Sequence, residues 1–214
     1  MPCASVLKPV YAWLAPEASD SRDLARAAIT ESSNEATDEL VRRIGGLDTL
    51  TIHLSRLAGH QLATPKTWGR YQVTTATVKR IYETMVSPDG HAGNEILAMM
   101  RDVVPPQRFG VPAGVAMKAG WDLSELRGRH VLVTNIVRVD SWVVTAHAGG
   151  RFLTASGADR WQDLLARRGP SAVTHLHQGM VPSHFGDQPL QEPGQGASFI
   201  GYGSGTTSPA AHAV

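Results

Sequence analysis

Three short polar motifs follow one another along the chain, and the first of them starts at its fifth residue. They are Ser5-Val6-Leu7-Lys8, Ser32-Ser33-Asn34 and Lys118-Ala119-Gly120. The first motif constrains the fold most, because Pro9 follows it directly and proline is tolerated in a helix only within the first turn. The apolar segment 5–15 is therefore predicted to form a buried helix that begins near Ser5.

Ser5 and Lys8 are three residues apart, a spacing that places two side chains on one face of a helix. A serine hydroxyl is a weak nucleophile at neutral pH and requires an adjacent base. A lysine shielded from water there has a lowered pKa and can act as that base. The N–H groups of the helix start also favour developing negative charge. The alternative is that Ser5 only caps the helix and that Lys8 is solvated.

The segment 24–46 predicts two helices joined by the Ser32-Ser33-Asn34 turn. Ser33 or Asn34 can cap the second helix, and acidic residues lie in its first turns. The pair Gly45-Gly46 supplies its C-terminal stop. Taken alone, the motif is equally compatible with an ordinary turn between helices, because turns favour these residue types.

The third motif is predicted to lie on a β-strand within 111–121, where apolar residues alternate before Gly120. The runs 129–138 and 140–147 are β-rich and separated by a tight turn, which is typical of a hairpin. Between the second and third motifs, two more helices are predicted. One is capped by Thr74 or Thr75 and extends to 86, and the other covers 95–102.

Together, the motifs and their contexts resemble the serine β-lactamase and penicillin-binding protein superfamily, and class A β-lactamases in particular. The resemblance covers residues 2–148. It implies an α+β fold in which a helical cluster packs on an antiparallel sheet. We expect this β-lactamase-like serine hydrolase domain to span residues 1–170. Residues 171–214, whose last part is rich in Gly, Pro, Ser and Ala, are expected to form a largely irregular tail.

The resemblance also implies roles for individual residues. It assigns the catalytic steps to Ser5 as nucleophile, Lys8 as base and Ser32 as proton carrier. It assigns substrate contacts to Asn34, Lys118, Gly120 and Trp121, where the backbone N–H of Trp121 joins that of Ser5 in an oxyanion hole. The implied substrate is a small molecule or peptide, of β-lactam or cell-wall type, that contains an amide, β-lactam or ester bond.

Two departures from the family pattern concern the chemistry. Ala119 replaces the hydroxyl residue of the third motif, and a hydrogen bond from that hydroxyl to a charged group contributes about 1.5–3 kcal/mol. The loop 58–70 contains neither Asp nor Glu, whereas class A β-lactamases carry there the Glu that activates the deacylating water. His60 is the one candidate neutral base in this loop, and a solvated His is the simpler interpretation. Acylation with slow deacylation is expected; the alternative is a non-catalytic or truncated β-lactamase-like binding protein.

A third departure concerns the sheet, because in this family a helix and two strands precede the nucleophile. With about three strands, one sheet edge is expected to be bare and open to pairing. Three sources could supply the missing strands at this edge: the segment 197–202, a partner chain in a homo-oligomer, or additional residues encoded by a true start upstream of Met1. The expected localisation depends on the start of the chain. A start at Met1, without a signal peptide, predicts a cytoplasmic protein, whereas a start upstream predicts an extracytoplasmic or secreted one.

Composition excludes several other function classes. The net charge of +1, without a basic stripe, argues against a nucleic-acid partner, and no apolar run approaches the length of a membrane span. The single Cys3 allows no internal disulfide and is interpreted as a small buried residue. His175, His177 and His184 lack the further ligands of a metal site, so neither a metal nor a cofactor is expected.

Overall fold

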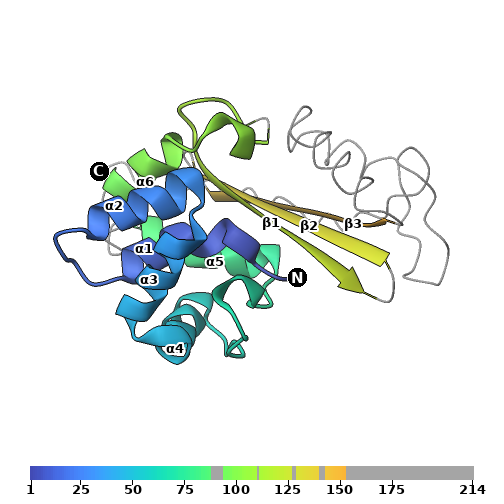
Figure 1. The fold of residues 1–214 in the computed structure, drawn as a ribbon, viewed down its shortest axis with the longest axis horizontal. Helices are drawn as coiled ribbons and strands as arrows, with labels where there is room; N and C mark the ends of the chain where they lie inside the picture. The colour runs from blue at the N-terminus through green and yellow to red at the C-terminus, as the bar shows by residue number, and fades with distance from the viewer. Residues whose placement is uncertain (88–93, 110, 127–128, 140–142, 153–214) are drawn as a thin grey trace, which may run out of the picture.

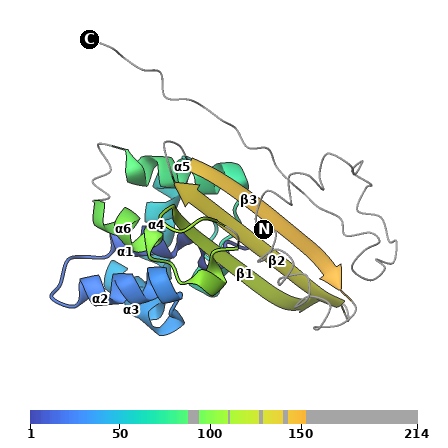
Figure 2. The same cartoon turned by 90° about the horizontal axis from the view of Figure 1, so that it is seen from above.

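The structure is a computed structural model that describes residues 1–87, 94–109, 111–126, 129–139 and 143–152. Within these residues, α-helices form a cluster at one end of a three-stranded antiparallel sheet, which extends past the helices on the other side (Figure 1). Figure 2 shows the same arrangement from above, with the strands side by side. The prediction of an α+β fold with a helical cluster packed on an antiparallel sheet is confirmed.

The helical elements are, in chain order, η1 (Ala4–Leu7), α1 (Lys8–Leu14), α2 (Ser21–Arg26), η2 (Ala27–Glu31), α3 (Asn34–Ile44), α4 (Gly46–Ala58), η3 (Trp68–Arg70), α5 (Thr75–Val86), α6 (Asn94–Arg101) and η5 (Pro105–Gln107). The strands are β1 (Ala116–Leu126), β2 (Arg129–Val139) and β3 (Val143–Phe152). Among the short elements, η2 is a single turn of π-helix, and η1, η3 and η5 are 3₁₀ turns.

The first helix is the centre of the cluster. The 3₁₀ turn η1 continues directly into α1, and Pro9 stands in the first turn of α1, where its missing N–H costs nothing. α1 contacts α2, α3, α5 and α6, and Val10 and Tyr11 are fully buried among them. The helix over 5–15 is therefore confirmed as a buried element.

The two adjacent serines of the turn after η2 have different structural roles. Ser33 is the N-cap of α3 and accepts from the Ala36 N–H at 3.1 Å, whereas Ser32 adopts the left-handed conformation with φ 61°. α3 ends at Gly45, also left-handed with φ 104°, as the Gly-Gly pair predicted. The helix α4 begins immediately afterwards and was not predicted from the sequence.

The strand of the third motif begins later than predicted, at Ala116 rather than near 111. The cause is Arg108, whose buried guanidinium donates to the carbonyl oxygens of Arg101 at 3.0 Å, Val111 at 3.0 Å and Val115 at 2.8 Å. These bonds fix the preceding segment as a compact loop. The helix caps elsewhere follow the sequence: Thr74 caps α5 by accepting from the Thr77 N–H.

The sheet has the order β1-β2-β3, with Gly120 opposite Asn135 in the β1–β2 register. In the described part of the chain, β1 and β3 each pair on one side only, as the three-strand prediction required. The segment 197–202 and the domain boundary at 170 lie outside the described residues, so these expectations and the homo-oligomer remain predictions.

Candidate active site

The start of the chain is fixed against two neighbours. It pairs with the segment before α5, since the Val73 N–H donates to the Met1 carbonyl at 2.8 Å and the Cys3 N–H to the Tyr71 carbonyl at 2.9 Å. From β2, the Asn135 side-chain amide donates to the carbonyls of Pro2 at 2.9 Å and Cys3 at 3.2 Å. These bonds place the following turn, η1, on the face of the sheet.

Gly120 allows the closest contact between η1 and the sheet. A Cβ atom at this position would lie 2.5 Å from the Val6 nitrogen and 2.9 Å from the Ser5 carbonyl carbon, and closer still to the Ser5 nitrogen. Real Cβ atoms do not approach backbone so closely, so only glycine fits. The Gly of the third motif is therefore the residue that lets β1 approach the first motif.

Ser5 lies in η1, one 3₁₀ turn before Lys8. The Lys8 N–H donates to the Ser5 carbonyl oxygen, and residues three apart are eclipsed in a 3₁₀ helix, so both side chains leave the same side of the turn. Ser5 is partly exposed between the buried residues Ala4 and Val6. Ser5 is therefore the residue of η1 that retains exposed surface.

Lys8 is fully buried, and the turn between η2 and α3 holds its ammonium group. The Nζ atom donates to the carbonyl oxygens of Ser32 at 2.6 Å and Ser33 at 3.2 Å. It also donates to Ser32 Oγ at 3.2 Å and to Asn34 Oδ1 at 2.8 Å. Among the hydrogen bonds of the described residues, none joins Lys8 Nζ to Ser5 Oγ. The structure thus brings Lys8, Ser32 and Asn34 into direct contact, and a solvated Lys8 is excluded.

Burial lowers the pKa of Lys8 to about 7, and the negative charge of Asp38 opposes part of that shift. At physiological pH a large fraction of this side chain is therefore the neutral amine. A neutral amine accepts a proton, so Lys8 has the chemistry of a general base.

Lys118 is the second buried lysine of the site. Burial lowers its pKa to about 7, and the positive charge of Lys8 adds to the effect. Its Nζ atom donates to Gln107 Oε1 at 3.3 Å, and the Gln107 amide in turn donates to the Glu31 carbonyl at 2.8 Å. Because Glu31 precedes Ser32, Gln107 links the third motif to the second, a contact that no motif in the sequence signalled.

Backbone strain lies beside these residues. Ala4 has φ 49° and Ser32 has φ 61°, both in the left-handed region, which costs about 1–2 kcal/mol for a residue with a Cβ. One of them directly precedes Ser5, and the other holds the carbonyl that binds Lys8. Such outliers are enriched at functional sites; Ser32 belongs to the second motif, whereas Ala4 belongs to none.

No protein-family model matches the chain, and no curated protein matches it. Solved structures do. The TLA-3 extended-spectrum β-lactamase matches with a TM-score of 0.57 at 14% identity, over 82% of this chain and 85% of that one. The TLA-1 extended-spectrum β-lactamase matches with a TM-score of 0.56 at 16% identity, over 78% and 81%.

A mutant of the class A β-lactamase of the last common ancestor of Gram-negative bacteria matches with a TM-score of 0.52 at 18% identity, over 84% of this chain and 86% of that chain. The chain has the fold of the serine β-lactamase superfamily. At these identities the likeness establishes the fold, while the chemistry has to be argued from the side chains.

On this β-lactamase fold, the loop that lacks carboxylates brings an aromatic ring to the site. The Trp68 ring lies over Lys8, with Nζ 4.8 Å from the ring centroid. Its Nε1–H donates to Asp38 Oδ1 on α3 at 2.7 Å. Sequence reasoning missed Trp68 and Asp38, because 30 positions separate them and neither belongs to a motif. His60, the base considered for this loop, is exposed, and its Nδ1 lies 3.2 Å from the Ala58 carbonyl oxygen.

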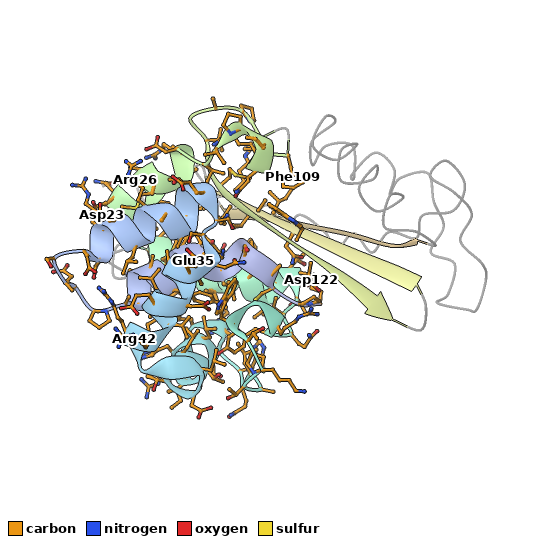
Figure 3. All side chains as sticks on the ribbon, in the orientation of Figure 1. Asp23, Arg26, Glu35, Arg42, Phe109 and Asp122 are labelled. Atoms are coloured by element: carbon orange, nitrogen blue, oxygen red, sulfur yellow. The ribbon has the colours of Figure 1, made fainter. Side chains whose placement is uncertain are left out.

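Trp121 follows Gly120 on β1 and is 38% exposed. Its ring packs against Phe109 with the centroids 5.5 Å apart. Figure 3 shows Phe109 in the segment that leads into β1 and Asp122 on β1, whereas Asp23, Arg26 and Arg42 lie on the outer side of the cluster. The oxyanion hole expected from the N–H groups of Ser5 and Trp121 requires the close contact that Gly120 permits.

The described residues contain no group of three His, Cys, Asp or Glu side chains arranged to hold a metal ion. His175, His177 and His184 lie outside that part of the chain. None of the helices found in the described residues has the length and apolarity needed to cross a membrane.

Proposed function

We infer that this protein is a serine acyl-enzyme hydrolase of the β-lactamase and penicillin-binding type. The observation that carries the proposal is the environment of Lys8. A fully buried lysine with its pKa lowered to about 7 stands one turn from Ser5 and bonds Ser32 and Asn34. A nucleophile, a base next to it and a group that orients the base form the arrangement that covalent catalysis requires.

In the acylation step, Ser5 Oγ attacks the carbonyl carbon of the substrate, and its proton passes to the neutral Lys8 amine. The new C–O bond leaves a negative charge on the carbonyl oxygen, which the N–H groups of Ser5 and Trp121 stabilise. The bond to the leaving nitrogen or oxygen then breaks. Its electron pair takes the proton back from Lys8 through Ser32 Oγ, which lies 3.2 Å from Nζ. The acyl group remains on Ser5 as an ester.

Lys118 and Asn34 are suited to holding the substrate. With Asn34 Oδ1 bound to Lys8, its amide nitrogen is the group left to donate to a substrate carbonyl. Within the described residues, Lys118 Nζ donates to one neutral acceptor, Gln107, and an ammonium has three donors. A substrate with a carboxylate near its reactive carbonyl matches this pair, although Ala119 supplies no hydroxyl to that carboxylate.

Slow hydrolysis of the acyl-enzyme follows from the loop before α5. It contains no Asp or Glu, and its His60 is exposed and bonded away from Lys8. This loop therefore supplies no carboxylate base to a water molecule near the ester. The expected behaviour is rapid acylation and a long-lived adduct, as for a penicillin-binding protein.

The test is intact-mass spectrometry after incubation with a fluorescent penicillin. We expect a one-to-one covalent adduct that Ser5→Ala abolishes and Ser87→Ala retains. Ser87 is a suitable control because it lies at the end of α5, where its hydroxyl bonds the Thr84 carbonyl. Absence of an adduct with penicillins and with other acylating probes would contradict the proposal.

A second candidate function is reversible binding without chemistry. Ala119, which is fully buried and lacks a hydroxyl, and the loop without carboxylates favour it. In that case calorimetry would detect a carboxylate ligand that Lys118→Ala weakens, while Ser5→Ala would leave the affinity unchanged and no adduct would form.

A further inference from the structure

The segment Trp68–Arg70, which we call the strap, crosses η1 and is attached on both sides of it. On the helical side, Trp68 Nε1 donates to Asp38 Oδ1 at 2.7 Å. On the sheet side, Arg70 Nη1 lies 3.0 Å from Asp122 Oδ2. Between them, a Cβ on Gly69 would stand 3.8 Å from the Ala4 backbone, so the strap lies directly on the turn that carries Ser5.

The backbone of the strap is held as well. The Trp68 carbonyl accepts from Tyr11 Oη at 2.9 Å and from Cys3 Sγ at 3.4 Å. Both donors are fully buried, and burial raises the pKa of Cys3 to about 12 and that of Tyr11 well above its usual range, so both keep their protons. The strap is therefore anchored to the core, to α3 and to β1.

The indole is placed where it closes access to Lys8. Its face lies over Nζ, and Lys8 has no exposed surface although it sits next to the partly exposed Ser5. The hydrogen-bond partners of Nζ among the described residues are the oxygens of the turn 32–34. Asp38 holds Trp68 in this position by accepting the hydrogen bond of its indole N–H.

Hydrolysis of an acyl-enzyme needs a water molecule within hydrogen-bond reach of a base. Here the water oxygen would attack the ester carbonyl carbon and pass its proton to the Lys8 amine. The bond from that carbon to Ser5 Oγ would break, and Ser5 would regain the proton from Lys8. The step balances without a carboxylate, but it requires a water next to Nζ, in the space that the indole covers.

We propose that the strap is a water-excluding cover whose Trp68 ring shields Lys8 and makes the acyl-enzyme of this protein long-lived. The long lifetime of the acyl-enzyme rests on the proposed function. The shielding of Lys8 rests on the contacts of the strap alone. Trp68 then determines whether the site behaves as an acylated binding protein or as a hydrolase. It is a positioning residue, because it acts on water and on Lys8 rather than on the substrate.

Shielding is measured by trace acetylation of lysines with acetic anhydride, followed by peptide mass spectrometry. The exposed Lys66 in the same loop is the internal reference. We expect Trp68→Ala to raise the Lys8-to-Lys66 labelling ratio at least tenfold and Trp68→Phe, which keeps an aromatic ring, to change it by less than threefold. Trp13→Ala, which removes a partly buried indole from α1, is the matched control and should leave the ratio unchanged.

The lifetime is measured by removing excess fluorescent penicillin and following loss of the adduct by intact mass. Trp68→Ala should shorten the lifetime at least tenfold, and Trp68→Phe should restore it. If Trp68→Ala does not fold, Arg70→Ala loosens the sheet-side anchor with the indole intact, and we expect it to move both readouts in the same direction by a smaller factor.

Each outcome separates the two proposals. An unchanged labelling ratio in the strap variants overturns the cover, whatever the adduct does. A raised ratio with an unchanged adduct lifetime overturns the link between the cover and slow hydrolysis. A wild-type protein that forms no adduct overturns the proposed function, and with it the role of the strap in hydrolysis, while the labelling ratio still decides the shielding.

Discussion

The two buried lysines of the site are held in different ways. Lys8 Nζ lies within hydrogen-bond distance of four oxygens of the turn 32–34 and under an indole. Lys118 donates to one neutral acceptor, Gln107, in the part of the chain that the structure describes. Oxygens of the protein itself satisfy the hydrogen-bonding capacity of Lys8, which suits a fixed catalytic group. Lys118 keeps donors available for an anion, which suits a substrate contact.

The largest difference between the two lysines should appear when each is removed. Lys8→Ala takes away the base and should reduce the rate of adduct formation by about 10²–10⁴-fold, the range for loss of general-base catalysis. The measurement is the rate of labelling by fluorescent penicillin at saturating concentration. A rate within threefold of wild type would show that Lys8 is structural.

Gly120 connects the surroundings of the two lysines, because it lies against the backbone of Ser5 and follows Lys118 by two residues. Gly120→Ala would place a Cβ against backbone atoms of η1, so η1 has to shift. Misplacing a nucleophile by about 1 Å costs about 10²-fold in rate, and overpacking costs about 1–3 kcal/mol of stability. Labelling rates and urea unfolding check both effects, with Gly114→Ala, where a Cβ meets no neighbour but φ is 80°, as a control for backbone strain alone.

Lys118→Ala should weaken substrate recognition rather than abolish chemistry. Losing a charge-assisted hydrogen bond of about 1.5–3 kcal/mol lowers the efficiency of acylation by about 10–150-fold. The effect should vanish for an activated ester without a carboxylate, which is the matched control on the substrate side. An equal loss for both substrates would assign Lys118 to catalysis and erase the contrast with Lys8.

The pH dependence separates the two lysines without a mutation. Acylation needs neutral Lys8, so its rate should rise with pH up to about 7; substrate binding needs charged Lys118, so efficiency should fall above about 7. Each limb should change by about tenfold per pH unit. In Lys118→Ala the alkaline limb should disappear and the acidic limb remain, whereas a profile that is flat between pH 5 and 9 would contradict both assignments.

The smallest effect is expected from restoring the hydroxyl of the third motif. Ala119→Ser adds a hydroxyl that can donate to a substrate carboxylate. A hydrogen bond to a charged group contributes about 1.5–3 kcal/mol, and placing an oxygen at this fully buried position offsets part of it, so we expect about a two- to tenfold gain in efficiency. Steady labelling kinetics measure it, and the activated ester without a carboxylate should show no gain.

Local signals were sufficient for much of the fold. The caps at Ser33 and Thr74, the stop at Gly45 and the start of the first helix before Pro9 all depend on neighbours within four residues, and each was predicted. α4 was missed because it begins at Gly46, directly after a stop signal and without a side-chain cap. β1 starts late because the Arg108 side chain bonds the carbonyls of Val111 and Arg101, and hydrophobic periodicity carries no signal for such side-chain bonds.

The site divides in the same way. The motifs predicted Ser5, Lys8, Ser32, Asn34, Lys118 and Gly120 as site residues. The structure brings Lys8, Ser32 and Asn34 into contact and places Gly120 against the backbone of Ser5. The burial of Lys8, the cover by Trp68 and the support from Gln107 depend on contacts between segments far apart in the sequence. The reason for the glycine at 120 also became visible only when η1 was seen against β1.

The most direct test of the central claim is to locate the acyl group. Because Pro9 follows Lys8, trypsin leaves the segment 1–22 as one peptide of the labelled protein, and fragmentation mass spectrometry can assign the modified atom within it. We predict that the penicilloyl group is on Ser5, at one equivalent per chain, and that it forms fastest near pH 7. An adduct on Lys8, on Ser32 or on any residue outside 1–22, or no adduct at all, would contradict the assignment of Ser5 as the nucleophile.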